Sequence, residues 1–323
     1  MKRDRSRRTF VLPRSAERLI WACLVFFLFS ANQSLRTKEL LSSHEDESSD
    51  PYQMALEESF GFFNDLPEDL WMERKRITHQ RTHVGLPHPL RTRIDPPAWY
   101  QQNWDPDFVC LHEDEIGGNQ DGHKWVCDPH RLKEYDDCLI YSFGSNNDFR
   151  FERDLQLTAP NCEVHIFDPT DYSRSLASDP RWKSLNATYH AWGIQSSYET
   201  FPNETEPHIY RATKAQLNRQ HRKPLVFHTL AESMELLGHT GRRVDVFKID
   251  CEGCEWKSYH DFLKADLRQV LIEVHEVVHV TYNFFEDLHQ AGYVMFHKEP
   301  NIQFGGGRCV EFGFLKLAPQ FFQ

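Results

Sequence analysis

The sequence lacks a surplus of positive charge, and no internal repeat is visible in it. Its 323 residues carry a formal net charge of −11 at pH 7. The basic residues are unevenly spread, because residues 1–31 hold seven Lys or Arg against Asp4 and Glu17. The rest of the chain is therefore more acidic than the whole. An acidic body repels phosphate backbones, so we expect no nucleic-acid partner.

Long apolar runs are also scarce. The uncharged stretch at residues 19–31 follows the basic residues 1–18 and is too short for the roughly 20 residues that span a bilayer. It suits a signal-peptide core of about 7 to 15 residues. Phe29 stands where a small residue should precede a cleavage site after Ala31, which favours an uncleaved signal anchor over a cleaved signal peptide. Residues 1–18 would then stay in the cytosol and the remainder would enter the lumen of the endoplasmic reticulum or Golgi.

Two features agree with a single-pass type II membrane protein or a secreted one. Glycosylation sequons begin at Asn32, Asn186 and Asn203. Seven cysteines follow residue 31, and in an oxidising lumen some of them should form disulfides. Because seven is odd, at least one thiol stays free or pairs with another chain. The spacing leaves the pairing open.

Regular structure is expected to be sparse between residues 32 and 107. An acidic stretch at 44–50 and five prolines between Pro87 and Pro106 interrupt every period, apart from a short helix that is possible at 59–72. We interpret residues 32–107 as a largely irregular stem. Residues 108–323 are long enough for one α/β domain with a substantial core.

From residue 138 onward, apolar strand patterns alternate with helical ones. Helices are expected at 149–157 and 282–290, and a capping box at Thr229 and Glu232 begins another. The last two strands are joined by a loop without helical period, which predicts an antiparallel hairpin. The predicted fold is a Rossmann-like α/β domain with a seven-stranded, mostly parallel sheet and helices on both faces. Its strands are expected at residues 138–143, 164–167, 187–194, 244–249, 269–275, 293–297 and 309–315.

Carboxylates gather at the ends of these strands, where open α/β folds place their chemistry. The strand that begins at Val244 ends in Asp250, Glu252 and Glu255. A turn at Gly144 follows the first strand, and Asp168 ends the second, 24 positions later. That arrangement is typical of a nucleoside site, in which the carboxylate binds ribose hydroxyls. The turn has one glycine where a dinucleotide fingerprint has three.

Several strings resemble the FkbM-like group of class I S-adenosylmethionine-dependent methyltransferases. The specific one is Lys-Ile-Asp-Cys-Glu-Gly-Cys-Glu at 248–255, supported by the strings at 272–275 and 311–315. The blocks at 121–127 and 141–145 are similar to the membrane-anchored, methyltransferase-like branch of that group. The resemblance implies S-adenosylmethionine as cofactor, with Gly144 and Ser145 near its amino-acid portion and Asp168 at its ribose. It also implies that Asp250 faces the sulfonium and the methyl acceptor.

One departure from the family pattern concerns the cofactor's ammonium group. Many methyltransferases have an acidic residue two positions before the first glycine, where this chain has Ser142. Glu152 or Asp148 would have to replace it. The resemblance further implies O-methyl transfer to a small or glycan-like acceptor, with Asp250, Glu252 and His275 as candidate bases. A neutral His275 would suit a lumenal pH of about 6 to 7.

Three alternatives compete with this interpretation. His275-Glu276-Val277-Val278-His279 satisfies the H-E-x-x-H pattern of zinc proteases, but that pattern works on a helix and these valines favour a strand. Cys251 and Cys254 form a C-x-x-C, which is typical of thiol-disulfide enzymes or of half a zinc site, but also of a structural disulfide, of core thiols or of chance. A catalytically silent binding module with a methyltransferase fold is the third, because Ser142 and the single-glycine turn weaken the cofactor site.

Overall fold

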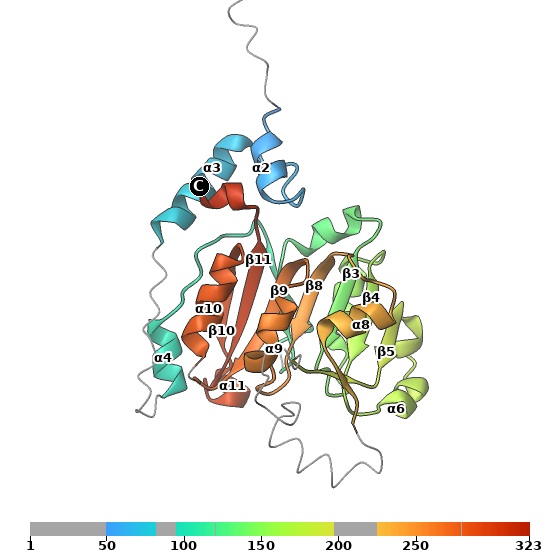
Figure 1. Cartoon of the computed structure of the whole chain (residues 1–323). Helices are drawn as coiled ribbons and strands as arrows, with labels where there is room; N and C mark the ends of the chain where they lie inside the picture. The colour runs from blue at the N-terminus through green and yellow to red at the C-terminus, as the bar shows by residue number, and fades with distance from the viewer. Residues whose placement is uncertain (1–49, 82–94, 120, 197–224, 279) are drawn as a thin grey trace, which may run out of the picture. The chain divides into compact units, whose positions relative to one another are not determined.

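The computed structural model describes residues 50–81, 95–119, 121–196, 225–278 and 280–323 (Figure 1). One compact unit runs from Met54 to Gln323, and the other covers residues 1–53. The predictions for residues 1–18, the apolar run at 19–31, Asn32 and Asn203 lie outside the described residues. Among the residues described, no helix combines the length and the apolar character that crossing a membrane requires.

A seven-stranded sheet lies at the centre of the unit that begins at Met54. Its strand order is β10-β11-β9-β8-β3-β4-β5, and β9, β8, β3, β4 and β5 pair in parallel. The predicted Rossmann-like α/β fold is confirmed. The strands span Leu139–Phe143 (β3), Glu163–Phe167 (β4), Ala187–His190 (β5), Val244–Ile249 (β8), Leu267–His275 (β9), Tyr293–Pro300 (β10) and Cys309–Lys316 (β11).

The last two strands form the predicted antiparallel hairpin. β11 lies between β9 and β10 and runs antiparallel to both. The connection between β10 and β11 was expected to lack helical structure, yet it contains the short helix α11 (Ile302–Gly305). Asn301 begins this turn because its side-chain oxygen accepts hydrogen bonds from the amides of Phe304 and Gly305.

The third predicted strand, 187–194, is split in the structure. Only Ala187–His190 (β5) joins the large sheet, whereas Gly193–Ile194 (β6) pairs with Phe227–His228 (β7) in a separate parallel pair. Gly193 is required here because a Cβ at this position would lie 2.7 Å from the ring of Phe227. The apolar run therefore continues through the break, and its periodicity does not reveal the change of partner.

Helices cover both faces of the sheet, as predicted (Figure 1). Alternate residues of each strand point to opposite faces. Tyr141 and Phe143 of β3 pack with α8 (Leu230–Leu236), α9 (Glu255–Phe262) and α10 (Thr281–Gln290). Ile140 packs on the other face with α5 (Arg150–Thr158) and the 3₁₀ turn η1 (Pro129–Glu134). The other short elements are α6 (Ser173–Ser178), η2 (Trp182–Ser184) and η3 (Pro319–Phe322).

Three helices occur in the stretch that was expected to be a largely irregular stem: α2 (Gln53–Glu58), α3 (Glu68–Gln80) and α4 (Pro96–Gln102). α3 begins after Pro67, so it overlaps the helix expected at 59–72 only at residues 68–72 and continues beyond it. The buried indole of Trp71 donates a 2.6 Å hydrogen bond to Glu58, which also pairs with Lys75 at 2.8 Å. Aromatic packing and these polar contacts hold α2 and α3 together, although the sequence shows no long period.

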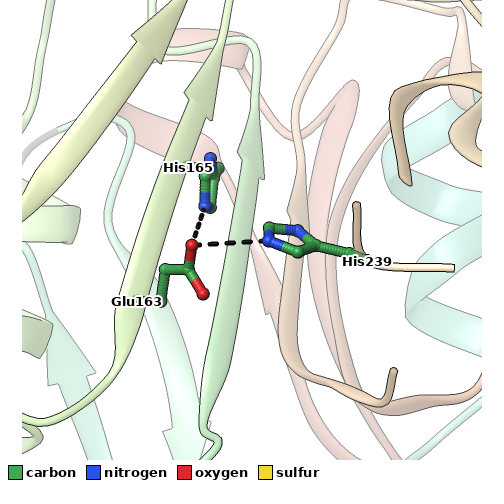
Figure 2. A group of neighbouring side chains, drawn as sticks. All are labelled: Glu163, His165 and His239. Atoms are coloured by element: carbon green, nitrogen blue, oxygen red, sulfur yellow. Dashed lines mark hydrogen bonds and ion pairs between the residues drawn. The ribbon is translucent and has the colours of Figure 1, made fainter. Parts of the chain in front are cut away.

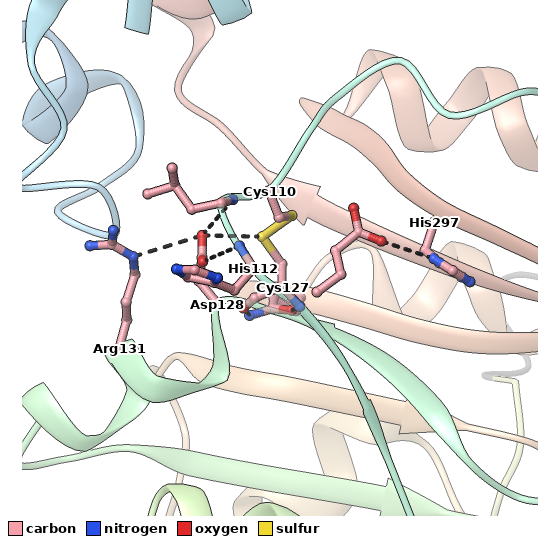
Figure 3. The surroundings of a disulfide bond; sticks show 9 residues. Cys110, His112, Cys127, Asp128, Arg131 and His297 are labelled. Atoms are coloured by element: carbon pink, nitrogen blue, oxygen red, sulfur yellow. Dashed lines mark hydrogen bonds and ion pairs between the residues drawn. A yellow bond between two sulfur atoms is a disulfide. The ribbon is translucent and has the colours of Figure 1, made fainter. Parts of the chain in front are cut away.

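A small antiparallel pair, β1 (Glu113–Ile116) and β2 (Lys124–Cys127), lies beside β9 and β11. The disulfide Cys110–Cys127 closes it, and the buried carboxylate of Asp128 accepts hydrogen bonds from the amides of Leu111 and His112 (Figure 3). Cys138–Cys162 and Cys251–Cys254 also form disulfides, and the thiol of Cys309 is free. The predicted odd thiol is therefore Cys309 among the cysteines described.

Candidate active site

The turn after β3 brings three strands together at the carboxyl end of the sheet. Gly144 has a φ of 82°, and its amide donates a 2.9 Å hydrogen bond to the carbonyl of Phe167 at the end of β4. A Cβ on Gly144 would lie 1.7 Å from the carbonyl oxygen of Asp250, which follows β8. Only glycine allows this approach. The single glycine of the turn thus sits where the first strand, Asp168 and Asp250 converge.

Asparagines supply the backbone conformations that further glycines would give in a dinucleotide fingerprint. Asn146 and Asn147 have φ values of 46° and 62°, and asparagine tolerates this left-handed region better than most residues. The Asn146 amide donates a 2.8 Å hydrogen bond to Asp168, whose other oxygen accepts one from Thr170. Burial raises the pKa of Asp168 above its ordinary value, and these amide hydrogen bonds oppose the rise. The turn and Asp168 form one hydrogen-bonded unit.

Glu152 lies next to Ser142, where the family pattern has an acid. It comes from the first turn of α5, is 1% exposed, and accepts a hydrogen bond from the Ser142 hydroxyl through Oε1. Its other oxygen, Oε2, and the Oγ of Ser145 are buried and have no hydrogen-bond partner among the described residues. Buried polar atoms without partners are costly and call for a ligand. These residues therefore fit a cofactor with an ammonium and a carboxylate.

Four charged residues form what we call the carboxyl-edge cluster: Lys124, Asp250, Glu273 and Glu311. The ammonium of Lys124, 1% exposed, lies 2.7 Å from Glu311, 3.4 Å from Asp250 and 3.9 Å from Glu273. Burial alone would lower the pKa of Lys124, but the three carboxylates outweigh it and the pKa rises. Lys124 is therefore a permanent cation that β2 inserts among acids from three strands.

The strand register forces two of these acids together. Glu273 of β9 and Glu311 of β11 are direct partners in the antiparallel ladder, where like charges repel. Burial and neighbouring carboxylates raise the pKa of both. Asp250 behaves in the opposite way, because Lys124, Lys248 and His275 overcome the effect of burial and lower its pKa. Asp250 thus stays ionised, while Glu273 and Glu311 retain protons more readily.

His275 ends β9 and contacts two of the carboxylates that follow β8. Its Nδ1 lies 2.9 Å from the fully buried Glu255, and its Nε2 lies 3.4 Å from Glu252. Burial alone would lower the pKa of His275, but hydrogen bonds with Cys309 and Glu255 and the charge of Glu255 raise it to about 12. The expectation of a neutral imidazole is wrong, because His275 is held as an imidazolium.

The local geometry also decides how the H-E-x-x-H and C-x-x-C motifs are interpreted. Residues 275–278 leave the strand through Glu276 at φ 60° and form no helix, so the H-E-x-x-H pattern does not present two histidines on one helical face. The side chain of His279 lies outside the described residues. Cys251 and Cys254 are joined as a disulfide in the turn before α9, which corresponds to the structural alternative for the C-x-x-C.

The structure therefore brings all seven residues predicted for the site to one edge of the sheet, in two neighbouring groups. Gly144, Ser145, Glu152 and Asp168 surround the turn after β3, and Asp250, Glu252 and His275 follow β8 and β9. Sequence reasoning missed Lys124, Glu273 and Glu311, and it named Glu255 among the acids after the Val244 strand without giving it a role. Lys124 lies within the 121–127 block that carried the resemblance, and the glutamates lie within the other quoted strings, so position in those strings was the available signal.

In the sheet, the antiparallel strand β11 is inserted between β9 and β10. A glycine turn follows β3, and an acid follows β4. This combination defines a class I methyltransferase fold. A family model described as a methyltransferase domain matches residues 53–316. The chain belongs to this methyltransferase family. The match begins at the first residue of α2, so it includes the helices that precede residue 108.

Individual relatives are more distant. The human protein named "Probable methyltransferase-like protein 24" is 26% identical over 179 residues, which cover 50% of this chain and 42% of that protein. The match therefore spans less than half of the relative's length. Among solved structures, an rRNA methylase from Streptococcus thermophilus aligns over 58% of this chain and 92% of its own, with 12% identity and a TM-score of 0.30. A precorrin-6y C5,15-methyltransferase from Geobacter metallireducens covers 58% and 85%, with 9% identity and a TM-score of 0.27.

Proposed function

We propose that this protein transfers a methyl group from S-adenosylmethionine to an oxygen of a small or glycan-like acceptor. The observation that carries the proposal is the convergence of the Gly144 turn, Asp168 and Asp250 at one sheet edge. Gly144 and Ser145 would approach the amino-acid portion of the cofactor, Asp168 would bind the ribose, and Glu152 would pair with the ammonium in place of the missing acid at Ser142. When bound, the cofactor supplies an activated methyl group on a sulfonium.

The chain's own residues would position the acceptor. An ionised Asp250 accepts hydrogen bonds, and it is the acid beside the turn that can align a hydroxyl and take up its proton. His275 is an imidazolium and cannot act as a base, so we assign it a positioning role through its contacts with Glu252 and Glu255. Several carboxylates at one edge suit an acceptor rich in hydroxyl groups, which is why a glycan-like acceptor is favoured.

We further propose that the domain resides in the secretory lumen, held by an anchor at residues 19–31. The disulfides Cys110–Cys127 and Cys138–Cys162 support an oxidising compartment, where such bonds persist. Asn186 of the second sequon is exposed at the start of β5 and is available for modification. A loss of apparent mass after endoglycosidase treatment of the protein from secretory cells would support this location, and an unglycosylated cytosolic protein would contradict it.

The experiment for the activity is a radiometric transfer assay with labelled S-adenosylmethionine and a panel of hydroxyl-bearing glycans. Asp250→Asn should lower transfer by at least about 100-fold, because an amide cannot take up the hydroxyl proton. Arg76→Met is the matched control, since the side-chain partners of Arg76 among the described residues are the exposed Glu73 and Gln80 on α3. Transfer by Asp250→Asn at the wild-type rate would contradict the site assignment, and label transferred only to amines would contradict the oxygen acceptor.

A further inference from the structure

A second group of ionisable side chains lies away from the carboxyl-edge cluster. We call it the histidine cluster: Glu163 at the start of β4, His165 two residues later, and His239 between α8 and β8 (Figure 2). One ligand atom from each residue lies within 4.8 Å of the other two. The methyl-transfer mechanism uses none of them, because they sit toward the amino ends of the parallel strands.

The distances in the histidine cluster match those of a metal centre. Glu163 Oε1 lies 2.9 Å from His165 Nε2 and 3.3 Å from His239 Nε2, and all three atoms converge in Figure 2. Zinc ligands at about 2.0–2.1 Å in a tetrahedron stand roughly 3.3 Å apart. A small separation of His165 and Glu163 would therefore admit an ion. Two imidazole nitrogens and a carboxylate oxygen are the ligands of many zinc sites that keep a fourth position for water.

Both histidines already have partners for their other ring nitrogen. His239 Nδ1 lies 2.7 Å from the hydroxyl of Tyr141, and His165 Nδ1 lies 2.8 Å from Nε2 of His190. If Nε2 of each histidine holds a metal, each Nδ1–H donates to one of these buried acceptors. Such outer hydrogen bonds fix the tautomer and the ring orientation of metal-bound histidines. The rings of His165 and His190 are also stacked, with centroids 5.1 Å apart, which limits rotation further.

The exposure of the three side chains also suits an ion that arrives from solvent. The side chains of His165 and His239 are 7% and 6% exposed, whereas that of Glu163 is 46% exposed and forms the entrance. Arg242 contacts Glu163 through the other oxygen, Oε2, at 2.8 Å. That contact holds the carboxylate in place and leaves Oε1 directed at the two histidines. Thiols, which would favour softer ions, are absent from this group.

We propose that Glu163, His165 and His239 form a Zn²⁺ site with water in the fourth position. The ion would link β4 to the segment between α8 and β8 and would stabilise this end of the sheet. The site is separate from the acceptor edge, so zinc is not a reactant in methyl transfer. Another group, Asp250 with Glu273 and Glu311, has comparable spacing, but Lys124 already places a cation among those carboxylates.

The test is a calorimetric titration of the full-length protein with Zn²⁺ after removal of metals by chelation, with Co²⁺ absorption as a spectroscopic probe. One Zn²⁺ per chain should bind with a micromolar or lower dissociation constant, and bound Co²⁺ should show the visible bands of a tetrahedral site. Glu163→Ala and His239→Gln should each remove binding. Tyr141→Phe, which takes away the acceptor of His239 Nδ1–H, should weaken it about 10- to 100-fold.

Asp250→Asn serves as the matched control, because it changes the carboxyl-edge cluster and should leave zinc binding at the histidine cluster intact. Circular dichroism and the count of disulfides would establish that each variant is folded. If His239→Gln fails to fold, Glu163→Ala still tests the proposal, because the side chain of Glu163 is half exposed. The proposal is overturned if the wild type binds no zinc, or if zinc binding persists in Glu163→Ala.

Discussion

The carboxyl-edge cluster and the histidine cluster lie on the same sheet, but their carboxylates and imidazoles have different charged partners. In the former, three acids surround the ammonium of Lys124, so the chain supplies its own cation. In the latter, one carboxylate faces two imidazoles, and the guanidinium of Arg242 contacts it from outside. A fixed cation orients acids for hydrogen bonding with a substrate, whereas uncharged imidazoles and a carboxylate offer lone pairs. The same fold thus provides one edge for an acceptor and one group for an ion.

The largest effect that separates the two clusters should come from Lys124→Met. Removing one partner from a buried ion pair leaves uncompensated charge and costs about 3–5 kcal/mol of unfolding free energy. The measurement is urea unfolding followed by circular dichroism. Lys124→Met combined with Glu311→Gln should recover part of the loss, because one of the repelling acids is then neutral. An unchanged unfolding midpoint in Lys124→Met would show that the acids need no fixed cation.

Removal of the Cys110–Cys127 disulfide should have the next largest effect. The bond closes a loop with a sequence separation of 17 and fixes β2, which carries Lys124. For loops of about 15 residues the loss is roughly 3 kcal/mol. Cys110→Ser with Cys127→Ser should therefore lower the unfolding free energy by that amount. Cys251→Ser with Cys254→Ser is the comparison, and its loss should be smaller because those cysteines are three positions apart. Equal losses would contradict the loop argument.

A change in pH should affect the carboxyl edge through His275. The pKa of His275 rises from about 6.5 in the unfolded chain to about 12 in the folded one, so the folded state binds one more proton between these values. The stabilisation is complete below pH 6.5 and declines as the pH rises toward 12. Each pH unit should cost about 1.4 kcal/mol in the wild type relative to His275→Gln. Unfolding measured at pH 7, 8 and 9 gives the two slopes, and parallel slopes would mean that His275 is neutral.

The smallest effect should come from the helix that leads toward His239. Thr229 caps α8 in a reciprocal capping box with Glu232, as the sequence predicted. Thr229→Ala should lower the unfolding free energy by about 1 kcal/mol because one amide at the helix start loses its acceptor. Thr229→Ser, which keeps the hydroxyl, should be close to the wild type in thermal unfolding. A loss of similar size in both variants would show that packing, rather than the cap, is responsible.

Most of the fold could be predicted from the sequence because its strands are apolar, buried and separated by clear turn signals. The strand that begins at Val244 and the hairpin at the C-terminus lie where their patterns place them. Two regions were predicted incorrectly, for physical reasons. The run at 187–194 changes partner after His190 without a change in hydrophobic period. Helices α2 to α4 are held by aromatic packing and by pairs such as Glu58 with Lys75, which leave no periodic signal.

The candidate site could be predicted where residues sit at or shortly after a strand end, or where the family resemblance pointed to them, as for Glu152. Asp168 and Asp250 follow their strands directly, so their positions follow from the strand assignment. Lys124 could not be placed, because its role depends on how β2 packs against β9 and β11, which residues distant in sequence decide. The pKa of His275 depends in the same way on Glu255 and Cys309. Glu163 and His165 are only two positions apart in sequence, but His239 is brought to them by the path of the chain after α8.

The most direct test of the central claim is a calorimetric titration of the purified protein with S-adenosylhomocysteine. The account predicts one binding site per chain in the wild type and in Asp250→Asn. It predicts a loss of about 10- to 100-fold in affinity for Asp168→Ala, because a hydrogen bond to a charged group contributes about 1.5–3 kcal/mol. No binding by the wild type would contradict the methyltransferase site and favour a catalytically silent module. Undiminished binding by Asp168→Ala would place the cofactor elsewhere.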